Sequence, residues 1–169
     1  MGIESRLRDA LTLWCGSRRE GSLLLVLVAV AATARLRYPA STRSCRDPGK
    51  SMGDGEAFET YFNEELPNIA DIGTLNIAFN GKDRTLGWVL YKWFRCALFH
   101  EAALAPEVSL VPSPRPGMLL VTNKSGLPPR VEITDALVVL LADLVCRSKE
   151  NISLPRDVRE EFIKHASGT

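Results

Sequence analysis

Two residues that could carry out proton transfer and phosphate chemistry stand five positions apart in the segment LYKWFRCALFHE, residues 90–101. Histidine is the side chain suited to taking up and returning a proton in catalysis, so His100 is a candidate general acid or base. Arg95 keeps its charge, and its forked donors match phosphate oxygens. Together they could cleave a phosphodiester without a metal, with Arg95 stabilising the charge that builds on phosphorus. Because the attacking group would be a ribose 2′-hydroxyl, the substrate would be RNA.

The spacing of this pair has little specificity by itself. The chain contains fifteen arginines and two histidines, and Arg159 with His165 fits the same pattern. The alternative is that His100 is an ordinary residue near a helix C-terminus, where the helix dipole favours positive charge, and that Arg95 pairs with an acid such as Glu101. The surrounding sequence must therefore decide between the two interpretations.

Two neighbours of the pair are candidate substrate-binding residues. Lys92 lies about one helical turn before Arg95 and could add affinity for phosphate. Glu101 follows His100 and could orient its ring. Either side chain could equally be a solvated surface group.

The segment that carries the pair resembles the motif helix of HEPN domains, which are small all-α bundles. The defining motif of that family is an arginine, four to six residues and a histidine, late in the bundle, and Arg95 and His100 match it. The apolar stretch EGSLLLVLVAVAATARLRYP and the Phe-rich helix after it extend the resemblance over residues 1–104. The resemblance implies a metal-independent endoribonuclease of a toxin–antitoxin or other defence system, with no metal and no cofactor.

The resemblance also implies partners. In HEPN proteins the motifs of two protomers meet in one cleft, so we expect a homodimer, with RNA as substrate and a possible cognate antitoxin of the nucleotidyltransferase type or another type. Five residues along a helix turn the side-chain direction by about 140°, so Arg95 and His100 cannot share one face of a straight helix. A dimer would relieve this separation, and Trp88, Tyr91 and Phe99 would suit its interface if exposed.

One position departs from the family pattern. Active HEPN members usually carry a polar residue directly after the motif arginine, whereas Cys96 stands there in this chain. A second hypothesis therefore remains open, in which the protein is a non-catalytic HEPN-like helical module that dimerises or binds RNA, an antitoxin or another partner.

Composition and charge set the broad class. The chain has 169 residues, of which 46% are hydrophobic, and a net charge of +1. That length fits one domain, residues 1–169, and the charge excludes a globally basic nucleic-acid binder. Residues 1–50 carry nine basic and four acidic residues, a net of +5, against −4 for the remainder. The basic third could face phosphates, or it could meet the acidic remainder of the chain.

Several classes of site are absent from the sequence. It contains no Gly-rich phosphate loop and no serine nucleophile elbow. The four cysteines are widely spaced, so neither a zinc site nor any other metal site is expected. The N-terminus lacks the layout of an export signal, which favours a reduced, cytoplasmic protein.

Hydrophobic periodicity and capping residues predict a mainly α fold. The apolar run at residues 22–34 is shorter than the roughly 20 residues of a membrane span, so we interpret it as part of a helix buried on all sides. We expect caps at Asp54, Thr85 and Thr134, a capping box at Ser17–Glu20 and a stop at Pro67. The predicted helices are 3–15, about 20–37, 54–66, 85–104 with inward Leu86, Leu90, Trp93 and Ala97, 135–147, and 155–165.

The residue pattern changes from helical to β-prone between the fourth and fifth predicted helices. Residues 108–111, 118–122 and 130–133 are short and β-prone, and turn-forming residues separate them. We expect them to form a small β flap over about residues 107–133, and residues 68–84 to be irregular. The predicted fold class is thus a HEPN-like antiparallel helical bundle with a β-hairpin or flap inserted before the fifth helix.

Overall fold

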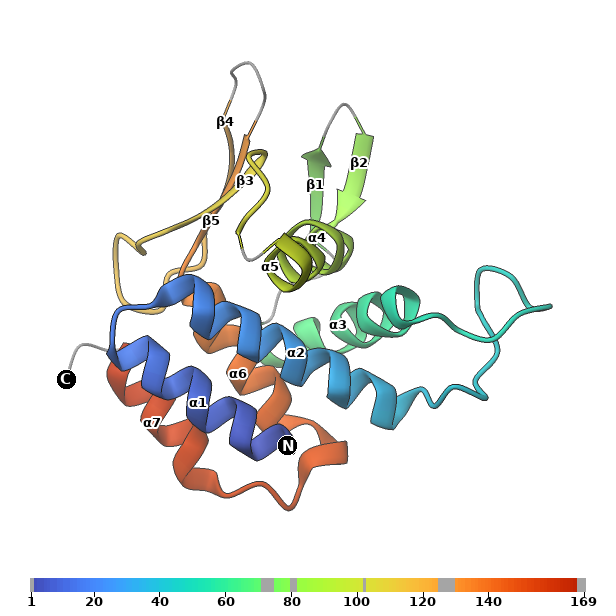
Figure 1. The fold of residues 1–169 in the computed structure, drawn as a ribbon, viewed down its shortest axis with the longest axis horizontal. Coiled ribbons are helices and arrows are strands. Elements are labelled where there is room, and N and C mark those ends of the chain that lie inside the picture. The colour runs from blue at the N-terminus through green and yellow to red at the C-terminus, as the bar shows by residue number, and fades with distance from the viewer. Residues whose placement is uncertain (1, 71–74, 80–81, 102, 125–129, 167–169) are drawn as a thin grey trace.

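A computed structural model describes residues 2–70, 75–79, 82–101, 103–124 and 130–166 of the chain (Figure 1). The protein is mainly α, as the sequence predicts. A central helix, α2, packs against α1, α3 and α6, and α7 lies against α1 and α6. These helices span Ile3–Cys15 (α1), Arg19–Arg37 (α2), Asp54–Ala70 (α3), Ala136–Arg147 (α6) and Arg156–Ala166 (α7).

The first two helices follow their periodicity, but their connection differs from the prediction. Leu7, Leu11 and Trp14 are buried on one face of α1, which ends at Gly16. The capping box expected at Ser17 does not form, because Ser17 has a positive φ of 59° and α2 begins only at Arg19. Ser17 thus belongs to the turn between α1 and α2.

The interpretation of α2 as a helix buried on all sides is wrong. Leu23, Val26, Leu27 and Val30 are buried, but a second face is only half-covered. We call this face the α2 stripe; its apolar members are Leu24, Leu25, Val28, Ala31 and Ala32, which are half-buried, and Leu36, which is 56% exposed. Among the residues that the structure describes, no helix has the length and apolar character needed to cross a membrane.

The third helix is longer than predicted. Phe58, Phe62 and Leu66 are buried, as their spacing indicates, but α3 runs through Pro67 to Ala70. The φ of a proline is compatible with a helix, and Pro67 removes one N–H from the hydrogen-bond ladder. Only three residues of α3 follow it, so the helix ends within one turn of this missing bond. Asp54 is the first residue of α3 and not its cap, and its carboxylate instead accepts a 2.6 Å hydrogen bond from Arg35 Nε.

Residues expected to be irregular contain a β-hairpin. Strands β1 (Asn76–Phe79) and β2 (Lys82–Thr85) pair antiparallel, with Phe79 opposite Lys82. Their pairing leaves two residues between them, Asn80 and Gly81, which lie outside the described residues. Asn-Gly is the pair that two-residue hairpin turns prefer, so the sequence itself contains a signal for a hairpin in this segment.

The predicted β flap is present as a three-stranded sheet. Its strands are β3 (Val108–Val111), β4 (Val121–Lys124) and β5 (Arg130–Thr134). Strand β5 is central, parallel to β3 and antiparallel to β4. The flap stands at one end of α6, beside the β1–β2 hairpin (Figure 1).

Thr134 does not cap α6, contrary to the prediction. It ends β5, and its hydroxyl accepts a hydrogen bond from Leu120 N at 2.9 Å and donates to Met118 O at 2.8 Å. The first turn of α6 is instead served by Ser113, whose hydroxyl accepts from Ala136 N at 3.0 Å. Asp135 holds this serine in place by accepting from its hydroxyl at 2.7 Å.

The basic first third of the chain meets acids of the remainder. The alternative that the basic residues pair with the acidic remainder of the chain is therefore confirmed for the pairs that follow. Ion pairs between residues 1–50 and the rest of the chain join Arg8 to Asp157, Arg19 to Asp135, Arg35 to Asp54, Arg37 to Glu64, Glu65 and Glu150, and Arg46 to Glu59.

The most enclosed of these pairs involve Arg37 at the C-terminal end of α2. Its side chain is 12% exposed, and two of its nitrogens each donate to a different oxygen of Glu150 at 2.8 Å, while the third nitrogen contacts Glu65. Glu150 belongs to a short 3-10 helix, η2 (Lys149–Asn151). The hydrogen bond from Arg37 lowers the pKa of Glu150 to about 2, against the opposing effect of burial. The guanidinium also lies 4.8 Å from the centre of the Tyr61 ring.

This lowered pKa makes the Arg37–Glu150 contact sensitive to acid. A carboxyl group with a lowered pKa stabilises the fold above its unfolded pKa of about 4.3, and that stability is lost as pH falls through the folded value. We expect Glu150→Gln to be less stable than the wild type by about 2–3 kcal/mol at pH 6, and the difference to shrink progressively toward pH 2. Urea unfolding followed by circular dichroism at both pH values measures it.

The matched control is Glu160→Gln, which changes an exposed carboxyl on α7. It should shift the unfolding free energy little at either pH, since exposed charges contribute little. A Glu150→Gln penalty of equal size at pH 6 and near pH 2 would contradict the assigned role of the ionised carboxylate.

Candidate functional site

The predicted site residues lie on one continuous run of helix after the β1–β2 hairpin. It consists of α4 (Leu86–Val89), a π-helical segment, η1 (Leu90–Arg95), and α5 (Cys96–Glu101). Thr85 caps its start, as predicted, because its hydroxyl accepts a hydrogen bond from Trp88 N at 3.2 Å. The same hydroxyl donates to Glu59 on α3 at 2.6 Å, so the cap also ties this helix to the bundle.

Glycine allows the helix to lie directly on α3. A Cβ added to Gly87 would be 3.1 Å from Cδ1 of Phe62, which is tighter than ordinary packing permits without movement. At Gly55 of α3, an added Cβ would be 2.8 Å from the Tyr91 ring. The two glycines thus set the distance between α3 and the segment that carries the candidate site.

The π-helical segment was not predicted, and it changes which side chains face the core. The large buried side chains recur every four positions, at Leu86, Leu90, Phe94 and Leu98, and the smaller Val89 and Ala97 are buried beside them, Ala97 as predicted. In a regular α-helix such a series drifts by about 40° per turn, whereas the wider π turn keeps it on one side. The inward position expected for Trp93 is therefore taken by Phe94, while Trp93 is half-buried.

Arg95 ends the π segment and lies among aromatic rings. Its guanidinium carbon is 5.1 Å from the centre of the Tyr91 ring and 5.9 Å from that of Phe99, distances at which cation–π attraction is significant. Its Nε is buried and has no hydrogen-bond partner within the described part of the chain. Phe99 is 60% exposed, whereas Trp88 and Tyr91, expected at an interface, are half-buried.

His100 lies in a different environment. A hollow of about 300 Å³ is lined by Lys92, Trp93, Cys96, Ala97, His100, Glu101 and Ala105. Three of the four predicted site residues, Lys92, His100 and Glu101, thus share one hollow. Arg95 does not line it. The imidazole is itself exposed and packs edge-on against Phe99, with ring centres 5.2 Å apart.

The structure therefore places the acid–base candidate and two of its neighbours at one hollow that Arg95 does not line. Arg95 and His100 both contact the ring of Phe99, which lies between them in this arrangement of rings. Within one chain, a phosphate held in the hollow would meet His100 and Lys92, while the guanidinium of Arg95 is engaged with the rings of Tyr91 and Phe99.

The second Arg–His pair of the sequence has other contacts. Arg159 on α7 is bound to Asp143 of α6 in an ion pair. His165 lines a separate hollow beside the proline-rich loop, together with Arg19 and Asp135. These two residues do not share a hollow either.

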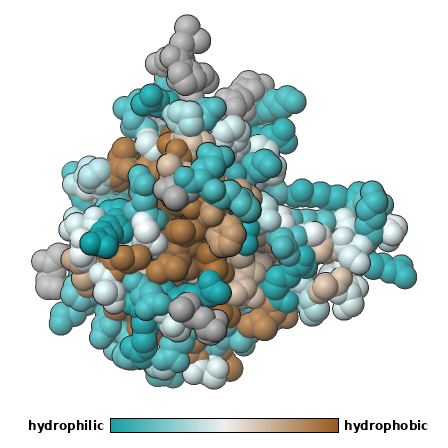
Figure 2. Space-filling model, in the orientation of Figure 1, coloured by the Kyte–Doolittle hydropathy of each residue, from teal (hydrophilic) through white to brown (hydrophobic). Residues whose placement is uncertain are grey.

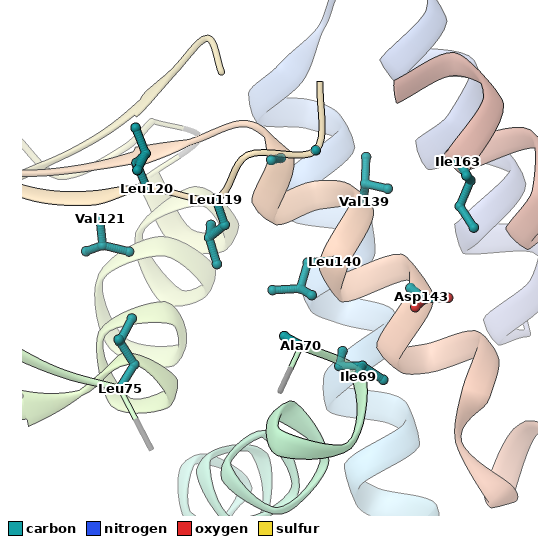
Figure 3. Close-up of a pocket in the computed structure, with 12 residues that line it drawn as sticks. Ile69, Ala70, Leu75, Leu119, Leu120, Val121, Val139, Leu140, Asp143 and Ile163 are labelled. Carbon is teal, nitrogen blue, oxygen red and sulfur yellow. The ribbon is translucent and has the colours of Figure 1, made fainter. Parts of the chain in front are cut away.

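Sequence reasoning missed the larger apolar cavity that Figure 3 shows. It has a volume of about 580 Å³ and lies between the flap, the end of α3, α6 and α7. Its labelled lining residues are Ile69, Ala70, Leu75, Leu119, Leu120, Val121, Val139, Leu140, Asp143 and Ile163. These residues come from segments far apart in the sequence, so no local motif announces the cavity.

Three or more His, Cys, Asp or Glu side chains do not gather into a possible metal site anywhere in the described residues. All four cysteines are free thiols.

The cap at Thr85 offers a direct test of how the site helix is held. Thr85→Ala removes the hydroxyl that bonds both Trp88 N and Glu59, so we expect the protein to lose about 1–2 kcal/mol of stability. Thr85→Ser keeps the hydroxyl and is the matched control, with a smaller loss. The midpoint of urea unfolding measures both, and equal losses for Ala and Ser would contradict the cap.

Comparison with curated proteins and with solved structures finds no match. The model of the Rv1289 family matches residues 2–155, which extend from the start of α1 to the residue before α7. On this match over most of its length, the chain belongs to the Rv1289 family.

Proposed function

We propose that the protein is a metal-independent endoribonuclease of HEPN type, in which two copies of the chain form one composite site from Arg95 and His100. The observation that carries this proposal is that the hollow of His100 within one chain is not lined by Arg95, whose guanidinium is engaged with aromatic rings. One chain alone therefore does not place both groups at one hollow. In a twofold dimer the same helix occurs twice, so Arg95 of one copy can face His100 of the other.

The surroundings of the pair suit an RNA strand. Phe99 is exposed next to the guanidinium of Arg95, and bases of a single strand stack on such aromatic and guanidinium surfaces. Lys92 is exposed beside the hollow of His100 and adds positive charge for the phosphate backbone.

The proposed reaction needs only groups of the protein and the RNA. His100 removes the proton of a ribose 2′-hydroxyl, the freed oxygen bonds to phosphorus, and the bond from phosphorus to the 5′-oxygen breaks. The 5′-oxygen leaves with a proton, from the conjugate imidazolium or from water, and a 2′,3′-cyclic phosphate remains. Arg95 stabilises the negative charge that builds on the phosphate oxygens, and Glu101 orients the imidazole.

The α2 stripe supports self-association. Figure 2 shows hydrophobic surface gathered in the middle of one face of the molecule, over α2. The stripe ends at Leu36, which is 56% exposed. Contiguous apolar surface of this kind marks interaction sites, and homodimer interfaces are rich in it. We assign the stripe to the contact with the second copy.

A second candidate function follows from the same geometry. Arg95 and His100 are apart in one chain, and Cys96 stands where active HEPN members usually carry a polar residue. These observations favour a non-catalytic HEPN-like module that binds RNA or an antitoxin partner through the same helix. The two functions differ in whether RNA is cut.

Mixing two inactive variants tests the composite site. Arg95→Ala and His100→Ala should each abolish cleavage of a labelled single-stranded RNA. After the two proteins are unfolded and refolded together in equal amounts, about half of the dimers contain one copy of each, with one intact site of two, so roughly one quarter of the wild-type rate should return. A site within one chain would regain nothing on mixing.

Three readings distinguish the outcomes. An RNA with a deoxyribose at the cleaved position should bind but stay uncut, because it lacks the attacking hydroxyl. Wild type that binds RNA without cutting it, and loses that binding on Arg95→Ala, supports the module instead. Wild type that neither binds nor cuts RNA contradicts an RNA-directed function of either kind.

Charge placed in the α2 stripe should separate the two copies. Ala32→Glu combined with Leu36→Glu puts two carboxylates into the proposed apolar interface, which costs several kcal/mol if they are buried there. Light scattering coupled to size exclusion should then report a monomer for this variant and a dimer for the wild type. Ile152→Glu is the control, since Ile152 is an apolar residue 89% exposed outside the stripe. A dimer that survives the double substitution would place the interface elsewhere.

A further inference from the structure

We propose that the cavity between the β flap and the helical bundle binds a small, neutral, apolar molecule. This site is separate from the helix that carries Arg95 and His100, since none of its lining residues lies on that helix. Its volume of about 580 Å³ falls in the range of about 300–1,000 Å³ that is usual for ligand pockets.

Most of the cavity wall is hydrocarbon, contributed by aliphatic side chains. In the view of Figure 3, Leu119, Leu120 and Val121 stand on the flap side, and Val139 and Leu140 stand on α6 opposite them. Leu119, Val121, Val139 and Leu140 are only half-buried, although all of them are apolar. In a closed core such side chains would be in contact across the interface, and water is a poor occupant of a hydrocarbon-lined space.

The flap wall is held by hydrogen bonds of its own. The Thr134 hydroxyl bonds Met118 O and Leu120 N, so it fixes the segment that carries Leu119 and Leu120 to the end of β5. The pair of Ser113 and Asp135 fixes the other end of the flap to the first turn of α6. Since these bonds do not depend on packing between Leu119 and α6, the flap can stand off the helix and leave the cavity open.

The charge at the cavity decides which ligand it accepts. Asp143 is the only charged residue among the described lining residues. Its Oδ2 is 2.9 Å from Arg147 Nε, and its Oδ1 is bound to Arg159, so two guanidinium groups, neither of which lines the cavity, compensate its charge. A cation would have to displace an arginine, and an anion would find no cationic side chain among the described lining residues. A neutral, largely apolar ligand meets neither cost.

A matched pair of dyes tests both the binding and the charge. N-phenyl-1-naphthylamine is neutral and apolar, and 1-anilinonaphthalene-8-sulfonate has the same ring system with a sulfonate added. Titration of the wild-type protein with each dye, followed by fluorescence, should give saturable binding of the neutral dye that is at least about tenfold tighter than that of the sulfonated dye. Equal affinities, or no saturable binding of the neutral dye, would overturn the proposal.

Filling the cavity should remove the binding. Leu140→Trp on α6 and Leu119→Trp on the flap each replace an aliphatic side chain at the cavity with a bulky indole ring. We expect a loss of neutral-dye affinity of about tenfold or more. Ile152→Trp is the control on an exposed apolar residue away from the cavity. Circular dichroism melts show whether the variants are folded. Unchanged binding by both folded variants would place the dye elsewhere.

Methyl NMR of the wild type keeps the test independent of the variants. Saturation with the neutral dye should shift the methyl signals of Leu119, Val121, Val139 and Leu140. Shifts confined instead to the α2 stripe would overturn the assignment. None of these measurements depends on RNA cleavage, so the cavity proposal is tested independently of the proposed ribonuclease function.

Discussion

The ion-pair cluster of Arg37 is the interaction on which the arrangement of the bundle depends. Its guanidinium joins the C-terminal end of α2 to Glu65 of α3 and to Glu150 of η2. These side chains are largely withdrawn from water, so each charge relies on its partners, and the loss of one partner leaves a charge less well compensated. Nearby, Asn151 of η2 donates a 2.9 Å hydrogen bond to Thr33 of α2, so two residues of η2 are bonded to the central helix. The cluster therefore sets where the chain after α6 returns to the bundle.

The position of α2 also fixes the elements around the hollow of His100 and around the apolar cavity. Helix α2 contacts η1 and α5, whose other side is fixed to α3 by the Thr85 cap and by the close approach at Gly87. It also packs against α6, which supplies the helical wall of the apolar cavity. One helix thus positions the candidate RNA site and the proposed ligand site, but on different neighbours. This separation allows each site to be tested with substitutions that leave the other in place.

Local signals predicted the helices well and their ends less well. The spacing of Leu7, Leu11 and Trp14 and the cap at Thr85 are decided within one or two turns, so the sequence alone indicates them. Thr134 failed as a predicted cap because its hydroxyl is taken by residues sixteen and fourteen positions earlier, which periodicity does not reveal. The π segment depends on how α4 and α5 meet the rest of the core, a tertiary effect.

The candidate site likewise has features that the local sequence predicts and features that depend on tertiary contacts. The motif named Arg95 and His100, and helix geometry already separated them by about 140°, which agrees with their different surroundings in the structure. The shared hollow of Lys92, His100 and Glu101 does not follow from their spacing, because at about 100° per residue His100 and Glu101 would lie about 80° and 180° around a regular α-helix from Lys92. The wider turns of the π segment Leu90–Arg95 reduce these angles, and the sequence did not predict that segment. The apolar cavity has no local basis in the sequence. Its lining residues come from segments far apart in the chain, and hydrogen bonds at Thr134 and Ser113 fix the flap within itself and to the first turn of α6. The space beside Val139 and Leu140 is therefore set by tertiary contacts, where an apolar sequence alone would indicate a closed core.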